Sequence, residues 1–153
     1  MKFEDLVKAA QQSITELFPW DLEEALIKNP NALLIDVREP DEYQAMHILH
    51  SINIPRGVLE SACEYNYEDT VPELVEARNR DVIVICRSGK RSALAAYSMQ
   101  QLGFQKVASL NTGLRGWSDY ELKLFDESGN IISEAASEEY FTPQLKPEQL
   151  SPK

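Results

Sequence analysis

Cys86 stands where an apolar stretch of the chain meets a cationic and hydroxylated one. The stretch Val82–Ile85 is wholly apolar, and no apolar side chain follows Cys86 until Ala93. A thiolate is a strong nucleophile, and positive charges beside it favour it over the thiol. This junction therefore predicts nucleophilic attack by Cys86, with an anionic adduct held by the residues that follow. Those residues are Arg87, Ser88, Gly89, Lys90, Arg91 and Ser92.

Such a loop needs a strand before it and a helix after it. Asp81 to Ile85 is the strongest strand signal in the chain, and Ser92 to Leu102 is the most convincing helix that follows. Ligands of an open parallel sheet bind beyond the carboxyl ends of the strands, where Cys86 would lie. Gly89 allows the backbone to curl, so that amide N–H groups and the positive end of the helix surround an anion. On these residues alone, Cys86 can also be a simple buried hydrophobic residue.

The rest of the chain alternates strands with helices. Ala32 to Val37 shows no polar alternation, as expected of a strand that is covered on both faces. The alternation predicts an α/β fold, with an open, mostly parallel sheet and helices on both faces. Further strands are expected at 14–17, 51–55 and 106–110, and helices over the first dozen residues, from Pro19 to about Ile27, from Pro40, and from Val71 to Arg78.

Length and charge narrow the class of protein. A chain of 153 residues suits one domain with its own core. The net charge of −10 argues against nucleic acid or an anionic membrane as a partner, because both favour basic surfaces. No apolar run approaches the roughly 18 residues of a membrane span, and the N-terminus lacks the apolar segment of a secretory signal. With two cysteines and no disulfide framework, a reducing cytoplasm is the expected location.

The other reactive side chains point to no second centre. Cys63 lies in an acidic, aromatic segment that disfavours a thiolate, so we interpret it as a bystander rather than as a resolving partner for Cys86. His47 and His50 are three residues apart, but they have no carboxylate or cysteine at ligand spacing. We therefore expect no metal and no cofactor.

Three blocks of the sequence occur together in a known family. They read LLIDVREPDEY with HILHSINIP, VIVICRSGKRSALAAYSMQQLGF, and LNTGLRGW. In this order they resemble the rhodanese family of sulfurtransferase domains, over about residues 14–120. The segment MHILHS keeps His47 and Ile48 of the family pattern but lacks its glycines and its proline.

We expect an N-terminal helix (1–13), a rhodanese-like domain (14–120) and an acidic, proline-containing tail (121–153) that would dock through Tyr140 and Phe141.

The resemblance implies a double-displacement reaction. Cys86 would take sulfane sulfur from a small anionic donor, thiosulfate or a persulfide, and hold it as a persulfide among the amides of Arg87 to Ser92. Cyanide, glutathione or a protein thiol would then accept the sulfur. Asp36, in the segment DVR, would brace the loop. Arg38 and Arg56 follow predicted strand ends, so both would line the rim of the site.

Two other functions stay open. Cysteine-dependent phosphatases of this fold place five residues between the cysteine and the arginine, whereas four residues separate Cys86 from Arg91. The smaller loop favours a single sulfur atom over a phosphate group, which disfavours a phosphatase or an arsenate reductase.

The second alternative is a sulfur carrier or a binding module without turnover, for which the tail would be a docking element. The presence of Cys86 favours a carrier over a pure binding module.

Overall fold

The protein is an α/β structure built on a five-stranded sheet, as predicted. The computed structural model describes residues 1–152. The strand order is β1-β5-β4-β2-β3, and every pair of neighbouring strands in this sheet is parallel. The strands are β1 (Thr15–Leu17), β2 (Leu33–Asp36), β3 (Ile52–Asn53), β4 (Val82–Ile85) and β5 (Val107–Leu110).

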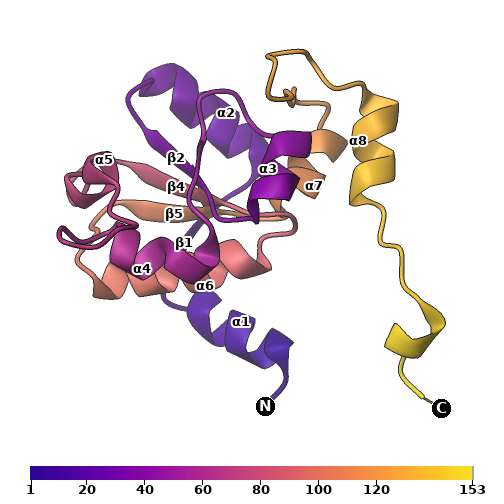
Figure 1. The fold of residues 1–153 in the computed structure, drawn as a ribbon, viewed down its shortest axis with the longest axis horizontal. Helices are drawn as coiled ribbons and strands as arrows, with labels where there is room; N and C mark the ends of the chain where they lie inside the picture. The colour runs from indigo at the N-terminus through magenta and orange to yellow at the C-terminus, as the bar shows by residue number, and fades with distance from the viewer. Residues whose placement is uncertain (153) are drawn as a thin grey trace.

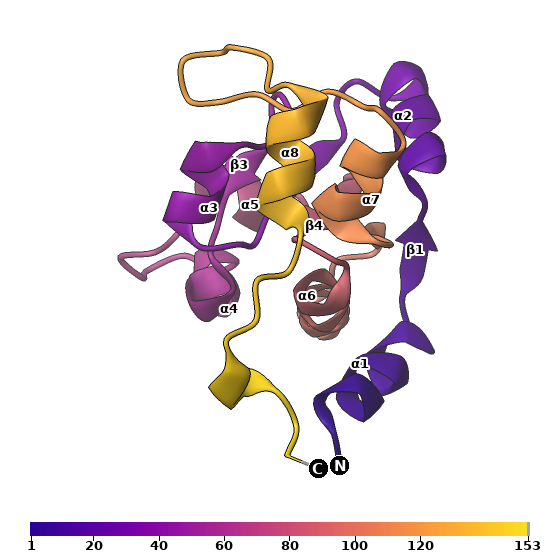
Figure 2. The ribbon, with the colours of Figure 1, turned by 90° about the vertical axis from the view of Figure 1, so that its right-hand side faces the viewer.

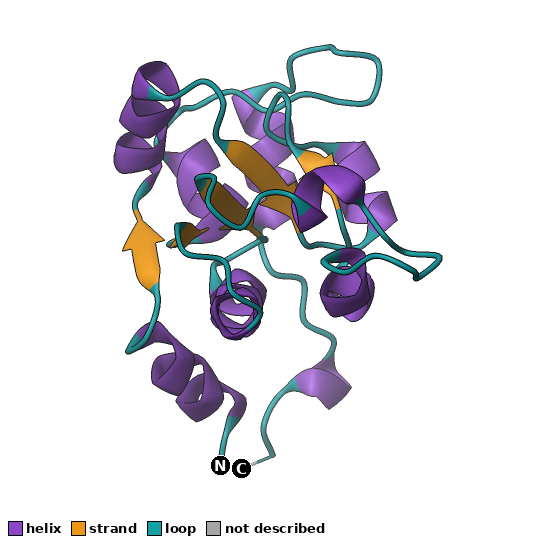
Figure 3. Cartoon of the chain, turned by 90° about the vertical axis from the view of Figure 1, so that its left-hand side faces the viewer, coloured by secondary structure: helices purple, strands orange, loops and turns teal. Residues whose placement is uncertain are grey.

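Helices cover both faces of the sheet (Figures 1 and 3). One face packs against α4, α5 and α6, and the other packs against α2, α7 and α8. Each of the helices among residues 1–152 is too short or too polar to cross a lipid bilayer. The helices are α1 (Phe3–Gln11), α2 (Pro19–Lys28), α3 (Pro40–Ala45), α4 (Leu59–Ala62), α5 (Pro72–Val75), α6 (Lys90–Gln101), α7 (Gly113–Asp119) and α8 (Glu134–Phe141), with 3-10 turns at Arg56–Val58 and Pro147–Gln149.

The central strand β4 shows why its sequence lacks polar alternation. Successive side chains of a strand point to opposite faces of the sheet. Val82 and Val84 therefore enter the core beneath α6, while Ile83 and Ile85 enter the core beneath α7. All four side chains are buried, because both faces are covered. The strand is thus a rigid platform that ends directly at Cys86.

Helix α6 begins two residues earlier than the sequence indicates. The expected start was Ser92, whereas the helix begins at Lys90, immediately after Gly89 in a left-handed conformation. The two cations Lys90 and Arg91 therefore belong to the first helical turn. The loop between the end of β4 and the start of α6 is correspondingly tight.

The packed structure continues beyond residue 120 as far as Phe141. The backbone of Phe125 forms two hydrogen bonds with that of His47, and each N···O distance is 2.9 Å. Phe141, at the end of α8, is 2% exposed and packs in the core beneath α7. Figure 2 shows α8 beside α7, with the chain running on past α6. The exposed tail is therefore confined to residues 142–152.

Candidate active site

Cys86 is held in a cradle of backbone amides at the carboxyl end of β4. The amides of Gly89 and Ser92 donate hydrogen bonds to Cys86 Sγ, with N···S distances of 3.1 and 3.2 Å. The residue is 1% exposed, so these donors act on a sulfur shielded from water. Amide donors directed at one atom from a tight loop stabilise negative charge on that atom. Of the predicted loop residues, Gly89 and Ser92 are thus the two that contact the sulfur of the predicted nucleophile.

A pair of buried serines extends the hydrogen bonding of Cys86. The thiol donates to Ser92 Oγ over 3.3 Å, and Ser92 Oγ lies 2.7 Å from Ser109 Oγ. Ser92 and Ser109 are both fully buried. Ser109 was not singled out from the sequence, although it is the one polar residue of the β5 segment VASL. Its position on the strand beside β4 places it next to the loop of residues 86–92.

Gly89 allows the loop to close. It has a φ of +90°, a conformation that side chains with a Cβ rarely adopt. A Cβ atom here would lie 3.0 Å from the amide nitrogen of Thr112. The glycine predicted to let the backbone curl is therefore required both for its conformation and for the space around it.

The start of α7 supports the loop from behind. The amides of Leu114 and Arg115 donate to the carbonyl oxygens of Cys86 and Arg87, over 2.9 and 3.0 Å. Gly113 makes this approach possible, because a Cβ atom on it would lie 2.5 Å from the carbonyl carbon and oxygen of Arg87. The segment NTGLRGW was recognised in the sequence, but the function of Gly113 was not assigned there. Only the packing of two segments far apart in the sequence reveals it.

Each cation of the loop has a partner on a different helix. Arg91 forms two hydrogen bonds with the carboxylate of Glu42 on α3, over 2.9 and 3.0 Å. Lys90 lies 3.5 Å from the carboxylate of Glu4 on α1. Arg87 Nη2 donates to the carbonyl oxygen of Phe141 at the end of α8, over 3.0 Å. Two of the three cations that the sequence places after Cys86 are thus paired with carboxylates, and the third is bonded to a carbonyl oxygen.

The ion pair between Glu42 and Arg91 also shifts the pKa values of both side chains. Partial burial raises the pKa of the Glu42 carboxyl, but the hydrogen bonds from Arg91 and the Glu39 amide, with the charges of Arg91 and Arg38, lower it by more. The net effect is a pKa below the ordinary range of a glutamate. The hydrogen bond to Glu42 raises the pKa of Arg91. Arg91 is therefore a charged anchor for the first turn of α6.

Asp36 and Arg38 form a brace below the site. The Asp36 carboxylate accepts hydrogen bonds from the Arg38 side chain over 2.9 and 3.0 Å, and from the Arg38 amide over 3.1 Å. Arg38 also donates to the carbonyl oxygen of Met46 over 2.6 Å. Both residues are completely buried. This corrects the prediction that Arg38 lines the rim, and it shows that Asp36 braces Arg38 rather than the loop of residues 86–92.

Arg56 is not brought to the loop. Its guanidinium pairs with Glu60 over 2.7 Å and donates to Ser98 Oγ over 3.2 Å. Ser98 lies eight residues after the start of α6, which is about 12 Å along the helix. The prediction that Arg56 lines the rim therefore has no contact to support it.

Cys63 and His47, which the sequence analysis assigned to no site, have contacts of their own. Cys63 is fully buried at the end of α4, and this burial raises the pKa of its thiol to about 11. The ring of His47 stacks on Tyr43 with a centroid distance of 3.9 Å, and its Nδ1 lies 2.8 Å from the Tyr43 carbonyl oxygen. Cys86 is the cysteine with amide donors at its sulfur.

Comparison with known proteins identifies the same region. The family described as "Rhodanese-like domain" matches residues 20–120. A putative sulfur carrier protein of Bacillus subtilis is 38% identical over 85 residues, which cover 56% of this chain and 40% of that protein. A putative mitochondrial thiosulfate sulfurtransferase of Schizosaccharomyces pombe is 35% identical over 92 residues, which cover 58% of this chain and 65% of that protein. The chain thus aligns with less than two thirds of the length of either relative.

A solved structure extends the comparison to the fold. It is a protein of unknown function from Rhodopseudomonas palustris, described as a possible tyrosine phosphatase. The TM-score is 0.70 at 27% sequence identity, and the match covers 86% of this chain and 95% of that chain. The likeness therefore extends beyond the region, residues 20–120, that the family matches.

Proposed function

This chain belongs to the rhodanese-like domain family, and from that premise we propose that it transfers sulfane sulfur through a persulfide on Cys86. The observation that carries the proposal is the cradle, in which two backbone amides donate to Cys86 Sγ over 3.1 and 3.2 Å. Such donors stabilise a thiolate before the reaction and a persulfide after it. The names of the two relatives, a sulfur carrier and a thiosulfate sulfurtransferase, support the same chemistry.

The first half of the reaction loads the cysteine. The Cys86 thiolate attacks the outer sulfur of thiosulfate, a bond forms between the two sulfur atoms, and the S–S bond of thiosulfate breaks. Sulfite leaves with the electron pair, and Cys86 becomes a persulfide. Arg87 is the loop cation whose described contact is a carbonyl oxygen rather than a carboxylate, so it is best placed to attract the anionic donor.

The second half returns the cysteine to its starting state. Cyanide attacks the terminal sulfur of the persulfide, thiocyanate forms, and the electron pair of the S–S bond returns to Cys86 as a thiolate. With glutathione or a protein thiolate as acceptor, the product is the persulfide of that thiol.

Both cysteines of the chain are free thiols, which is consistent with the reducing cytoplasm that we propose as its location.

The pairing of Arg91 disfavours phosphate as a substrate. A phosphatase of this kind needs its loop arginine to bind a phosphate oxygen, whereas both nitrogens of the Arg91 fork are taken up by Glu42. Together with the four-residue spacing from Cys86 to Arg91, this favours sulfur transfer over phosphate hydrolysis.

Intact-mass measurement after incubation with thiosulfate tests the proposal. We expect the wild type and the matched control Cys63→Ser to gain the mass of one sulfur atom, and Cys86→Ser to gain none. Loading of Cys86→Ser, or an unloaded wild type, would contradict the persulfide mechanism. Turnover with cyanide and thiols then separates an enzyme from a carrier that loads without turning over, and hydrolysis of an aryl phosphate would instead support a phosphatase.

A further inference from the structure

An exposed aromatic cluster lies at the start of α2, on the sheet face that α7 and α8 also cover. Phe18 and Trp20 stack with their ring centroids 4.9 Å apart, and Trp20 contacts Tyr120 with a centroid distance of 5.3 Å. These three side chains are 42%, 47% and 48% exposed. Large aromatic side chains that gather on a surface mark an interaction site more often than single exposed residues do. The proposed sulfur chemistry uses none of the three.

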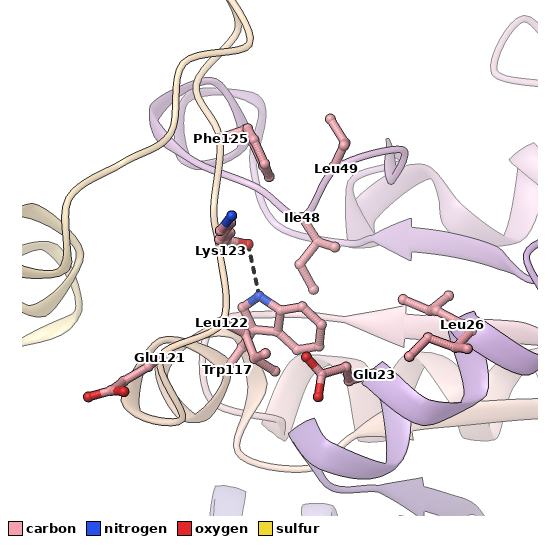
Figure 4. Close-up of a pocket in the computed structure, with 10 residues that line it drawn as sticks. Glu23, Leu26, Ile48, Leu49, Trp117, Glu121, Leu122, Lys123 and Phe125 are labelled. Atoms are coloured by element: carbon pink, nitrogen blue, oxygen red, sulfur yellow. Dashed lines mark hydrogen bonds between the residues drawn. The ribbon is translucent and has the colours of Figure 1, made fainter.

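A groove adjoins this cluster. It has a volume of about 560 Å³, larger than the cavity beside the catalytic loop at about 220 Å³. Figure 4 shows the Trp117 indole in the groove, with Ile48 and Leu26 beside it. Ile27 and Leu49, which also line the groove, are 78% and 45% exposed. The groove is therefore an apolar surface that water covers in the isolated chain.

The cluster and the groove form one continuous surface. Trp20, Glu23 and Ile27 are spaced three and four residues apart on α2, which places them on the same side of that helix. Tyr120 directly precedes Glu121, which lines the groove. We call this surface the α2 face, and it consists of Phe18, Trp20, Tyr120 and the groove residues Leu26, Ile27, Ile48, Leu49 and Trp117.

The charges around the α2 face indicate what would cover it. Glu23 and Glu121 line the groove, and neither forms an ion pair among the described residues. Lys123 is the single cation in the lining. A second copy of the chain would bring another two carboxylates and one cation to the same interface, so the excess of negative charge would be doubled, which costs free energy. A basic partner would meet them favourably.

We propose that the α2 face docks an apolar, positively charged segment of a partner protein. Its aromatic and aliphatic side chains would fill the groove over Trp117, and its lysines or arginines would lie at Glu23 and Glu121. The site is physically linked to the catalytic loop, because Trp117 is on α7, whose first turn binds the carbonyl oxygens of Cys86 and Arg87. The docking does not depend on sulfur at Cys86, so it holds or fails independently of the proposed function.

The two tryptophans of the chain, Trp20 and Trp117, both belong to the α2 face, so intrinsic fluorescence reports directly on its occupation. The probe is a synthetic amphipathic helix-forming peptide of leucine and lysine, and its counterpart has glutamate in place of lysine. We expect the lysine peptide to change the tryptophan emission in a saturable, salt-sensitive way, and the glutamate peptide to have no effect. No saturable change with the lysine peptide, or an equal response to both peptides, overturns the proposal.

A matched pair of variants separates docking from general attraction to an acidic protein. Ile27→Asp and Tyr67→Asp each add one negative charge at an exposed side chain, 78% and 58% exposed, so neither should affect folding. Docking predicts that Ile27→Asp weakens the affinity for the lysine peptide about tenfold, while Tyr67→Asp leaves it unchanged. Unchanged or stronger binding to Ile27→Asp would show attraction to charge alone. Sedimentation of a wild-type dimer that Ile27→Asp dissociates would assign the face to a second copy, and it would also overturn the proposal.

Discussion

Cys86 and Cys63 are both buried, but their sulfur atoms have different surroundings. Cys86 Sγ receives two amide hydrogen bonds at the end of β4, which favour negative charge on the sulfur. At Cys63, desolvation is the largest effect and raises the pKa of the thiol to about 11, in spite of the opposing charge of Arg78. Two buried thiols in one core are therefore suited to different chemistry.

Cys63 should be inert in the folded protein near neutral pH. In Cys86→Ser, where Cys63 is the single remaining thiol, an aromatic disulfide reagent should react slowly, because the thiol stays protonated until the pH approaches about 11. The release of the reagent's chromophore measures the rate. Unfolding in denaturant is the control, and it should expose one full equivalent. Rapid reaction of the folded variant at neutral pH would contradict the assignment of Cys63 as a bystander.

The Glu42–Arg91 pair should make stability depend on pH in the acidic range. Because the folded-state pKa of Glu42 is below its unfolded value of about 4.3, the contribution is present in full above that pH and is lost as the pH falls through the folded-state pKa. The two side chains are 20% and 35% exposed, so the pair contributes roughly 1 kcal/mol. Urea unfolding should show Glu42→Gln less stable than the wild type at neutral pH, and this difference should shrink as the pH falls below about 4. A difference that does not shrink at acidic pH would contradict this explanation.

At the scale of elements, the loop of residues 86–92 is held between the starts of two helices, α6 and α7. Gly113→Ala should disrupt this arrangement, because its φ is +60° and the new Cβ would lie 2.5 Å from backbone atoms of Arg87. We expect a loss of about 2–4 kcal/mol in the free energy of unfolding. Sulfur loading should slow by about a hundredfold, since the cradle would be displaced. Gly57→Ala is the control, as a Cβ at that position would meet no neighbouring atom within 4 Å, and normal loading by Gly113→Ala would refute the supporting function of α7.

Helix α8 should be required for the position of Arg87. Phe141→Ala removes a side chain that is 2% exposed, at a cost of about 3 kcal/mol, and frees the carbonyl oxygen that binds Arg87. We expect the KM for thiosulfate to rise, with a smaller change in kcat, because Arg87 would still be present but no longer fixed. Leu145→Ala, 64% exposed, is the control and should change neither. In an Arg87→Met background, Phe141→Ala should raise KM no further, and a fully additive effect would contradict the link.

The elements that were predictable from the sequence are those with a local signal. The strands β2, β4 and β5 are buried on both faces and are mostly apolar in sequence, and Gly89 is marked by its place between a strand and a helix. Helix α8 has few buried residues and an acidic composition, so its segment resembles a solvated tail. The partner of Arg91 lies 49 residues earlier in the chain, and nothing local to either residue shows that they meet.

For the whole molecule, the boundary between packed core and exposed tail falls at residue 142. Helix α8 is anchored by Phe141 and by the hydrogen bond of 2.7 Å between Ser137 Oγ and Ser118 Oγ, whereas every residue from 142 to 152 is exposed. Hydrogen exchange should therefore show slow amides at the end of α8 and fast exchange beyond residue 142. Limited proteolysis should remove the tail and leave a core that still loads sulfur. Fast exchange throughout α8 would contradict its docking.

Helices α1 and α8, which lie outside the family-matched region, both contact the loop of residues 86–92. Glu4 on α1 pairs with Lys90, and the end of α8 binds Arg87. The region that the family matches, 20–120, contains neither helix. The loop cations are thus fixed in part by segments that a comparison limited to the family's core would leave out.

The buried serine pair next to Cys86 allows the hydrogen bonds at its sulfur to reverse direction without moving a heavy atom. With a neutral thiol, the S–H group points to Ser92 Oγ, and the Ser92 hydroxyl can point on to Ser109. When the sulfur becomes negative, the Ser92 hydroxyl can rotate to donate to it, and Ser109 can donate to Ser92 in turn. Two rotating hydroxyls therefore satisfy both charge states of the sulfur. The site would meet each half of the proposed two-step reaction with the same backbone and the same packing, so little reorganisation would be needed between them.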